Sequence, residues 1–268
     1  MNITDNLTLG TTSFGPDNAP TIAITHGWAT DHNFLLPFVD IFPNNKVILI
    51  DMPGYGKSKH LAQFSNNLRQ TANLLLNTLP VGCILVSWSI STLAGTLACS
   101  QDKEHKISKF ISICGTPRFP CDPHWPGFDY KYVLKSFKLF EKRHNDRTIK
   151  MFFKLQTQSH LLSESQKDFL LDSFEKMGQI ETSVLKSGLD KMASSDYREA
   201  LLSTKISCLH IFGGKDRLVK PELSNILFAP PYHMCSVLEN SAHLPFLTEP
   251  EELRKIIEIF IKNSYTGP

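Results

Sequence analysis

The stretch LVSWSISTLAG (85–95) places serines at 87, 89 and 91 between an apolar run and a helix-forming run. A serine nucleophile can be presented on a sharp turn between a strand and a helix, with small residues two positions before and after it. Ser89 fits this arrangement, because CILV precedes it, ISTLAGTLAC follows it, and Ser87 and Ser91 are small. Centring the turn on Ser87 would put Leu85 at a position that requires a small residue, and Ser91 would lie inside the helix. Ser89 is therefore the predicted nucleophile.

The usual form of this turn has glycine at both flanking positions, whereas this chain has Ser87 and Ser91 there. Glycine accepts strained backbone conformations more easily than serine does. We therefore expect the two flanking serines to tolerate a strained backbone.

A serine hydroxyl needs a histidine base that is itself oriented by a carboxylate. In a fold with this kind of turn, the acid and then the histidine follow the serine along the chain. Asp216 comes just after a strand and a Gly-Gly turn in LHIFGGKDRLVKP (209–221), and His243 lies in the loop of VLENSAHLPFLTEP (237–250). The predicted catalytic residues are Ser89, Asp216 and His243.

Two backbone amides are candidates for an oxyanion hole. ITHGWATDHNF (24–34) is a strand that ends in His-Gly. We expect the N–H groups of Trp28 and Ile90 to point at the developing oxyanion, and His26 to brace the loop. DMPGYGKS (51–58) lacks the G-x-x-x-x-G-K-S/T spacing of a phosphate-binding loop, so we interpret it as a shaping loop.

The elements that must position these residues alternate between strands and helices. The chain contains several near-continuous apolar runs, which are typical of parallel strands buried on both faces. Helical patterns at 65–79, 91–104 and 251–262 accompany these runs. The predicted fold class is α/β, with a mostly parallel, doubly wound sheet. The predicted strands are 21–25, 46–50, 83–87, 109–114, 206–212 and 235–239.

The region 118–199 departs from this alternation. It contains no convincing strand but repeats helical spacing, as in Leu170/Phe174/Met177 and Leu185/Leu189/Met192, so we expect about four helices, two of them within 130–160. We predict a helical lid at 118–199, inserted into an α/β core formed by 1–117 and 200–268. Such a lid would lie over the carboxyl edge of the sheet, where open α/β sheets bind ligands.

Composition narrows the class of protein. The net charge is +2, and the six cysteines have neither CxxC nor His/Cys ligand spacing. The start MNITDNLTLG lacks the features of a secretory signal, and no apolar run approaches the length of a membrane span. We expect a reduced, cytoplasmic protein, a monomer with no metal, no cofactor and no nucleic-acid partner.

Several motifs together resemble the α/β-hydrolase family over essentially the whole chain: HGW, DMPGYGKS, SWSIS, GGKDRLV and SAHLPF. The segments at 110–129, 147–158 and 188–201 resemble the esterases that hydrolyse the methyl ester of pimeloyl-acyl-carrier protein in biotin synthesis. The more telling feature is the FxKLQ run after an Arg-Thr pair. The departure from the family pattern is the sharp turn at residues 87–91, here called the elbow, which is SxSxS instead of GxSxG.

The resemblance implies a role for each matching residue. Ser89 would attack the ester carbonyl, His243 would transfer the proton to methanol, and Asp216 would hold the imidazole. Oxyanion amides would come from Trp28 and Ile90, and the run 152–156 would line the acyl channel. The implied substrate-binding residues are Trp28, Ser89, Ile90, Phe152, Phe153, Lys154, Leu155, Gln156 and His243.

The segment 131–154 carries eight basic and two acidic residues, a local charge of +6 that leaves −4 for the rest of the chain. A basic lid could steer an acidic acyl-carrier protein to the site, although a solvated lysine-rich helix face gives the same pattern. The candidate carrier-protein contacts are Lys142, Arg143, Arg147 and Lys150.

Two other functions fit the same residues. The same triad would serve a general short-chain carboxylesterase or a carbon–carbon bond hydrolase. A non-catalytic ligand-binding protein of the same fold is an alternative of another class, which the two elbow serines favour. Dehalogenases and epoxide hydrolases normally use an aspartate where Ser89 stands.

Overall fold

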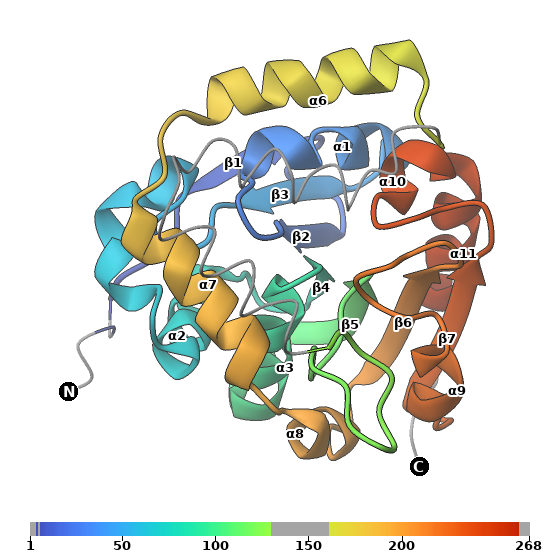
Figure 1. Ribbon diagram of the computed structural model, residues 1–268. Coiled ribbons are helices and arrows are strands. Elements are labelled where there is room, and N and C mark those ends of the chain that lie inside the picture. Colours follow the sequence, from blue (N-terminus) through green and yellow to red (C-terminus); the bar gives the residue numbers. More distant parts are fainter. Residues whose placement is uncertain (1–3, 5, 130–160, 263–268) are drawn as a thin grey trace.

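The computed structural model describes residue 4 and residues 6–129 and 161–262. Within these residues a seven-stranded sheet has the order β1-β3-β2-β4-β5-β6-β7 (Figure 1). The strands are β1 (Thr11–Phe14), β2 (Thr21–Thr25), β3 (Lys46–Ile50), β4 (Cys83–Trp88), β5 (Ile107–Ile113), β6 (Ser207–Gly213) and β7 (His233–Leu238).

Six of these strands match the apolar runs predicted from the sequence, and they pair in parallel with one another. The predicted α/β class with a mostly parallel sheet is thereby confirmed. Strand β1 was not predicted from the sequence. It pairs antiparallel with β3 at one edge of the sheet. Its sequence, TTSF, has only one apolar residue, and none of the four residues is fully buried, so no apolar run marks this strand.

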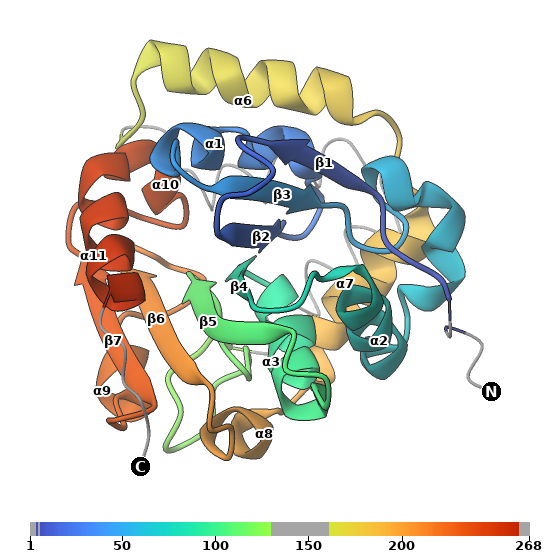
Figure 2. The same cartoon turned by 180° about the vertical axis from the view of Figure 1, so that it is seen from behind.

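Helices cover both faces of the sheet, as the two opposite views show (Figures 1 and 2). The helices of the core are η1 (His32–Leu35), α1 (Pro37–Ile41), η2 (Gly56–Phe64), α2 (Leu68–Thr78), α3 (Ser91–Gln101), α9 (Leu223–Leu227), α10 (Pro245–Thr248) and α11 (Pro250–Lys262). Side chains of α2 and α3 pack with one buried cluster, and side chains of α1, α10 and α11 pack with a second.

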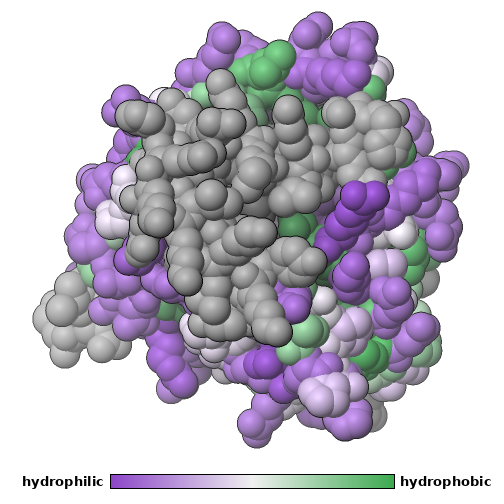
Figure 3. Space-filling model, in the orientation of Figure 1, coloured by the Kyte–Doolittle hydropathy of each residue, from purple (hydrophilic) through white to green (hydrophobic). Residues whose placement is uncertain are grey.

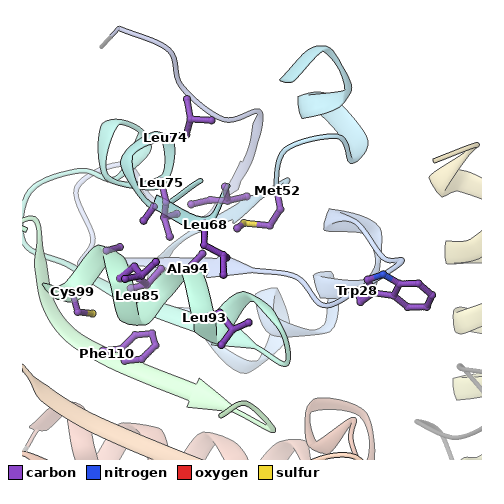
Figure 4. Close-up of a cluster of buried hydrophobic side chains, with 14 of the residues drawn as sticks. Trp28, Met52, Leu68, Leu74, Leu75, Leu85, Leu93, Ala94, Cys99 and Phe110 are labelled. Atoms are coloured by element: carbon purple, nitrogen blue, oxygen red, sulfur yellow. The ribbon is translucent and has the colours of Figure 1, made fainter. Parts of the chain in front are cut away.

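The first buried cluster fixes the helix that follows β4. Figure 4 shows Leu85 of β4 and Phe110 of β5 beside α3 and near Leu75 of α2. Gly95 of α3 permits this close approach, since a Cβ there would lie 2.7 Å from the Phe110 ring. The start of α3 is therefore held firmly against the carboxyl end of β4.

The chain between β5 and β6 contains the helices α6 (Glu164–Met177), α7 (Thr182–Ser194) and α8 (Arg198–Leu202). Two of the predicted helical patterns correspond to α6 and α7, and the other two lie outside the described residues. The capping box of Ser163 and Gln166 begins α6. In Figure 1, α6 lies beyond α1 at one side of the sheet, and α7 crosses near α2 and α3.

Figure 3 shows a mainly hydrophilic described surface, with hydrophobic residues near the top where α6 lies. Leu171 of α6 is one of the exposed large hydrophobic residues. Across the described part of the chain, no helix combines the length and apolar character that crossing a bilayer requires.

Candidate active site

Ser89 occupies the tight turn between β4 and α3, with φ of 61°. This left-handed conformation is rare for serine and marks a strained turn. The backbone holds it in place, because Ser89 N–H donates to the Ile113 carbonyl at 2.9 Å and Thr92 N–H donates to the Ser89 carbonyl at 3.1 Å. The side chain is 3% exposed.

The flanking serines differ from the expectation that they would carry the backbone strain. Neither Ser87, within β4, nor Ser91, the first residue of α3, has a positive φ, and the strained residue is Ser89 itself. Thr25 Oγ1 lies 2.9 Å from Oγ of both flanking serines, and Ser91 Oγ also donates to the Trp88 carbonyl at 2.9 Å. The two flanking serines therefore connect the elbow to β2 through hydrogen bonds with Thr25.

His243 lies between Ser89 and Asp216. Its Nδ1 is 2.6 Å from Asp216 Oδ2, and its Nε2 is 2.8 Å from Ser89 Oγ. Because the carboxylate can only accept, Nδ1–H donates to it, and Nε2 is left to accept the Ser89 hydroxyl proton. His243 and Asp216 are 1% and 4% exposed, so the hydrogen-bond chain is shielded from water.

The acid is fixed by its own backbone. Asp216 Oδ1 accepts the N–H of Leu218 at 2.8 Å and of Val219 at 3.1 Å, which leaves Oδ2 for the imidazole. The Cys114 thiol, just past β5, lies close to Asp216, and burial followed by this neighbouring charge raises the pKa of Cys114. Cys114 was not predicted as a site residue, since nothing in the local sequence distinguishes it from the other buried cysteines.

The loop after β2 touches the elbow. A Cβ on Gly27 would lie 3.2 Å from the Trp88 ring and 3.4 Å from Ser89 Cβ. His26 braces this loop, because Nδ1–H donates to the Gly27 carbonyl at 2.8 Å and Nε2 accepts Met52 N–H at 2.9 Å. Burial lowers the pKa of His26, in keeping with a neutral ring.

Trp28 and Ile90 line one cavity of about 40 Å³ beside the elbow. The Trp28 indole extends to the end of the sheet, away from the cluster around Leu75 and Leu85 (Figure 4). There its Nε1–H donates to the Leu185 carbonyl of α7 at 2.8 Å. A Cβ on Gly188 would lie 2.3 Å from Trp28 Cδ1, so α7 packs directly on the indole.

The DMPGYGKS loop is organised around Asp51. Its carboxylate accepts the N–H of His32 and of Lys57, each at 2.9 Å, and lies 2.8 Å from His32 Nδ1. Burial opposes ionisation, but these hydrogen bonds lower the pKa of Asp51. A Cβ on Gly56 would collide with this carboxylate, which fits a shaping role for the loop.

Among the described residues, three groups bring ligand-type atoms within 4.8 Å of one another: Cys208/His210/His233, Cys114/Asp216/His243 and Asp31/His32/Asp51. In the first group His210 Nδ1 bonds Ser112 Oγ at 2.8 Å and Nε2 bonds His233 Nδ1 at 3.1 Å. Burial and the neighbouring His233 lower the pKa of His210 to about 3, so the ring is neutral. Each group contains internal hydrogen bonds, and we assign a metal to none of them.

The predicted acyl-channel residues fall in the part of the lid that the structure does not describe. Phe152, Phe153, Lys154, Leu155 and Gln156 lie outside the described residues. The same holds for the carrier-protein candidates Lys142, Arg143, Arg147 and Lys150.

Relatives with curated names are similar over nearly the whole chain. The pimeloyl-[acyl-carrier protein] methyl ester esterase of Yersinia enterocolitica is 29% identical, covering 91% of this chain and 94% of that protein. The esterase of the same name from Serratia marcescens is 26% identical, covering 90% and 93%.

Solved structures share the fold at lower identity. An esterase from Exiguobacterium antarcticum has a TM-score of 0.81 at 17% identity and covers 94% of each chain. A bromoperoxidase from Bacillus anthracis has a TM-score of 0.81 at 18% identity, covering 94% of this chain and 95% of that one. The model of the alpha/beta hydrolase family matches residues 22–256, most of the 268 residues, and the chain belongs to this family.

Proposed function

We propose that the chain is a serine carboxylesterase that hydrolyses the methyl ester of pimeloyl-acyl-carrier protein and releases methanol for biotin synthesis. The observation that carries the proposal is the buried hydrogen-bond chain from Ser89 through His243 to Asp216. The named relatives support the substrate, because their similarity spans about nine tenths of this chain.

In the first half of the reaction, Ser89 Oγ attacks the ester carbonyl carbon as His243 Nε2 takes the hydroxyl proton. The carbonyl oxygen becomes an oxyanion, which the N–H groups of Trp28 and Ile90 stabilise; losing one such donor typically costs about 3–4 kcal/mol. The intermediate then expels the methoxy group, which receives the proton from His243 and leaves as methanol. An acyl ester on Ser89 remains.

In the second half, a water molecule attacks the acyl-enzyme and gives a proton to His243. That proton returns to Ser89 Oγ as the carboxylic acid departs, so the enzyme is unchanged. Asp216 stays ionised throughout, holding the imidazole in the tautomer that can accept at Nε2 and stabilising the imidazolium.

A fluorophosphonate probe tests the nucleophile. Wild-type protein should become labelled on Ser89, and Ser89→Ala or His243→Ala should abolish labelling. Ser87→Gly is the matched control within the same serine triplet and should still label. Wild-type protein that never labels would overturn the proposal and favour a ligand-binding protein of the same fold.

Complementation tests the substrate. A biotin-requiring strain that lacks its pimeloyl methyl esterase should grow with the wild-type gene and fail with Ser89→Ala. Charge reversal at Arg147 and Lys150 should lower kcat/KM for the carrier-linked ester but spare p-nitrophenyl acetate. Labelling without complementation would favour a general short-chain esterase or a carbon–carbon bond hydrolase.

A further inference from the structure

The cavity beside the elbow has a lysine among its lining residues. It measures about 40 Å³, and its lining includes Trp28, Ile90, Leu68 and Lys191. Since a site needs roughly 10–15 Å³ to hold one water molecule, this space takes about three heavy atoms. A carboxylate group has three heavy atoms.

Lys191 lies on α7 and is one of the residues that line this cavity. Its Nζ donates one hydrogen bond, to the Ser65 carbonyl at 2.5 Å, and the same carbonyl also accepts Ser187 Oγ–H at 2.7 Å. Within the described ranges, Lys191 has no carboxylate at ion-pair distance. Burial lowers its pKa to about 8.

An ammonium group has three N–H donors, and one is accounted for by Ser65. A desolvated cation without a counter-ion is costly, and a carboxylate in the cavity would offset that cost by accepting the remaining donors. The cavity is also lined by Ile90 and Ser91, the two residues that follow Ser89, so it adjoins the nucleophile.

We propose that Lys191 is a specificity-determining residue that binds the free carboxylate of a short dicarboxylic acid half-ester while Ser89 attacks the ester at its other end. This second substrate class rests on the proposed ester hydrolysis at Ser89. It differs from the carrier-linked substrate, which has no free carboxylate. Monomethyl succinate and monomethyl glutarate are the simplest members of the class.

Lys191 also connects α7 to the core through Ser65, and a purely structural residue would do the same. The two roles differ in their effect on selectivity. A structural role predicts equal losses for charged and neutral esters when Lys191 is changed. A carboxylate-binding role predicts a loss confined to the charged ester.

The experiment compares kcat/KM for monomethyl glutarate with that for the methyl ester in which an isopropyl group replaces the carboxylate. The charged-to-neutral ratio should fall about 10- to 100-fold in Lys191→Met, because hydrogen bonds to charged groups are of that strength. Lys191→Gln should behave like Lys191→Met, and Lys191→Arg should restore part of the ratio. Lys186→Met, which removes an exposed lysine of the same helix, should leave the ratio at the wild-type value.

The pH dependence gives an independent readout. The charged-to-neutral ratio of kcat/KM should decline as pH rises through about 8, where Lys191 in the free enzyme loses its proton. Any ionisation that affects the hydrolysis of both esters equally cancels in the ratio. A ratio that is independent of pH, or unchanged in both Lys191→Met and Lys191→Gln, overturns the proposal.

Binding separates this inference from the proposed function. Calorimetric titration of the Ser89→Ala protein with glutarate requires no turnover. Glutarate binding that is lost on adding Lys191→Met supports the carboxylate site even if no ester is hydrolysed by the wild-type protein. Absence of glutarate binding to Ser89→Ala, together with normal hydrolysis of neutral esters, rejects the carboxylate site and leaves the esterase intact.

Discussion

Gly188 of α7 offers the most direct test of how the candidate oxyanion loop is held. A Cβ at this position would lie 2.3 Å from Cδ1 and 2.7 Å from Nε1 of Trp28. Because carbon atoms pack at about 3.5–4.0 Å, Gly188→Ala requires the indole or the helix to move by about 1 Å. Trp28 is 2% exposed and bonded to α7, so it has little room to rotate.

Because the buried indole has little room to rotate, we expect its displacement to shift the backbone N–H of Trp28, a candidate oxyanion donor. A misplacement of about 1 Å at a catalytic group can cost about 100-fold in rate, and we expect Gly188→Ala to lower kcat by about that factor. Overpacking should also lower the free energy of unfolding by about 1–3 kcal/mol. The assay is kcat and KM for p-nitrophenyl acetate, with urea unfolding to verify that the variant is folded under assay conditions.

A double-mutant cycle identifies the route of the effect. In a Trp28→Ala background there is no indole to collide with, so Gly188→Ala should cost little further activity. Asp190→Ala, an exposed substitution on the same helix, is the matched control and should retain wild-type kcat. The reasoning is wrong if folded Gly188→Ala protein keeps kcat within twofold of wild type, or if its loss is equally large without the indole.

Three further outcomes can be measured. Asp216→Asn should lower kcat about 10⁴-fold with the fold retained, because an amide cannot fix the tautomer of His243; a tenfold loss or less would exclude its orienting role. Ser87→Gly should keep kcat within a few-fold but lower the free energy of unfolding by about 1 kcal/mol through a lost hydrogen bond, and a large fall in kcat would contradict this. The native pKa of His210, about 3, lies below its unfolded value of 6.5, so the unfolded chain binds the extra proton as pH falls. The free energy of unfolding should therefore decline below pH 6.5, by about 2 kcal/mol at pH 5, and His210→Gln should flatten this part of the urea-unfolding pH profile.

The sequence predicted those parts of the site whose signals are local. The elbow could be found because a strand, a serine and a helix follow one another within a dozen residues, and the parallel strands could be found from their apolar runs. The position of strain was not predicted correctly, because Ser89 rather than its neighbours adopts the positive φ. Strand β1 was missed because its short, partly exposed sequence has no strong pattern.

The contribution of α7 could not be predicted in the same way. Gly188 and Lys191 reach Trp28 and Ser65 only after the chain has folded across more than a hundred residues. A glycine inside a helical pattern is itself a signal, since it costs about 1 kcal/mol relative to alanine and often has a packing reason. It does not reveal which side chain the helix approaches.

The contacts of α7 affect how the site can operate. Hydrogen bonds donated by Trp28 Nε1, Ser187 Oγ and Lys191 Nζ join this helix to the loop after β2 and to Ser65. Buried Leu185 and Leu189 add apolar contact on the same side. If α7 moved away to admit a substrate, the Trp28 indole would lose its hydrogen bond to the Leu185 carbonyl, and the candidate oxyanion amide of Trp28 would lose this support. If the Trp28 amide is an oxyanion donor, we therefore expect substrate to react with α7 in place, so that this helix is a wall of the candidate site and not its gate.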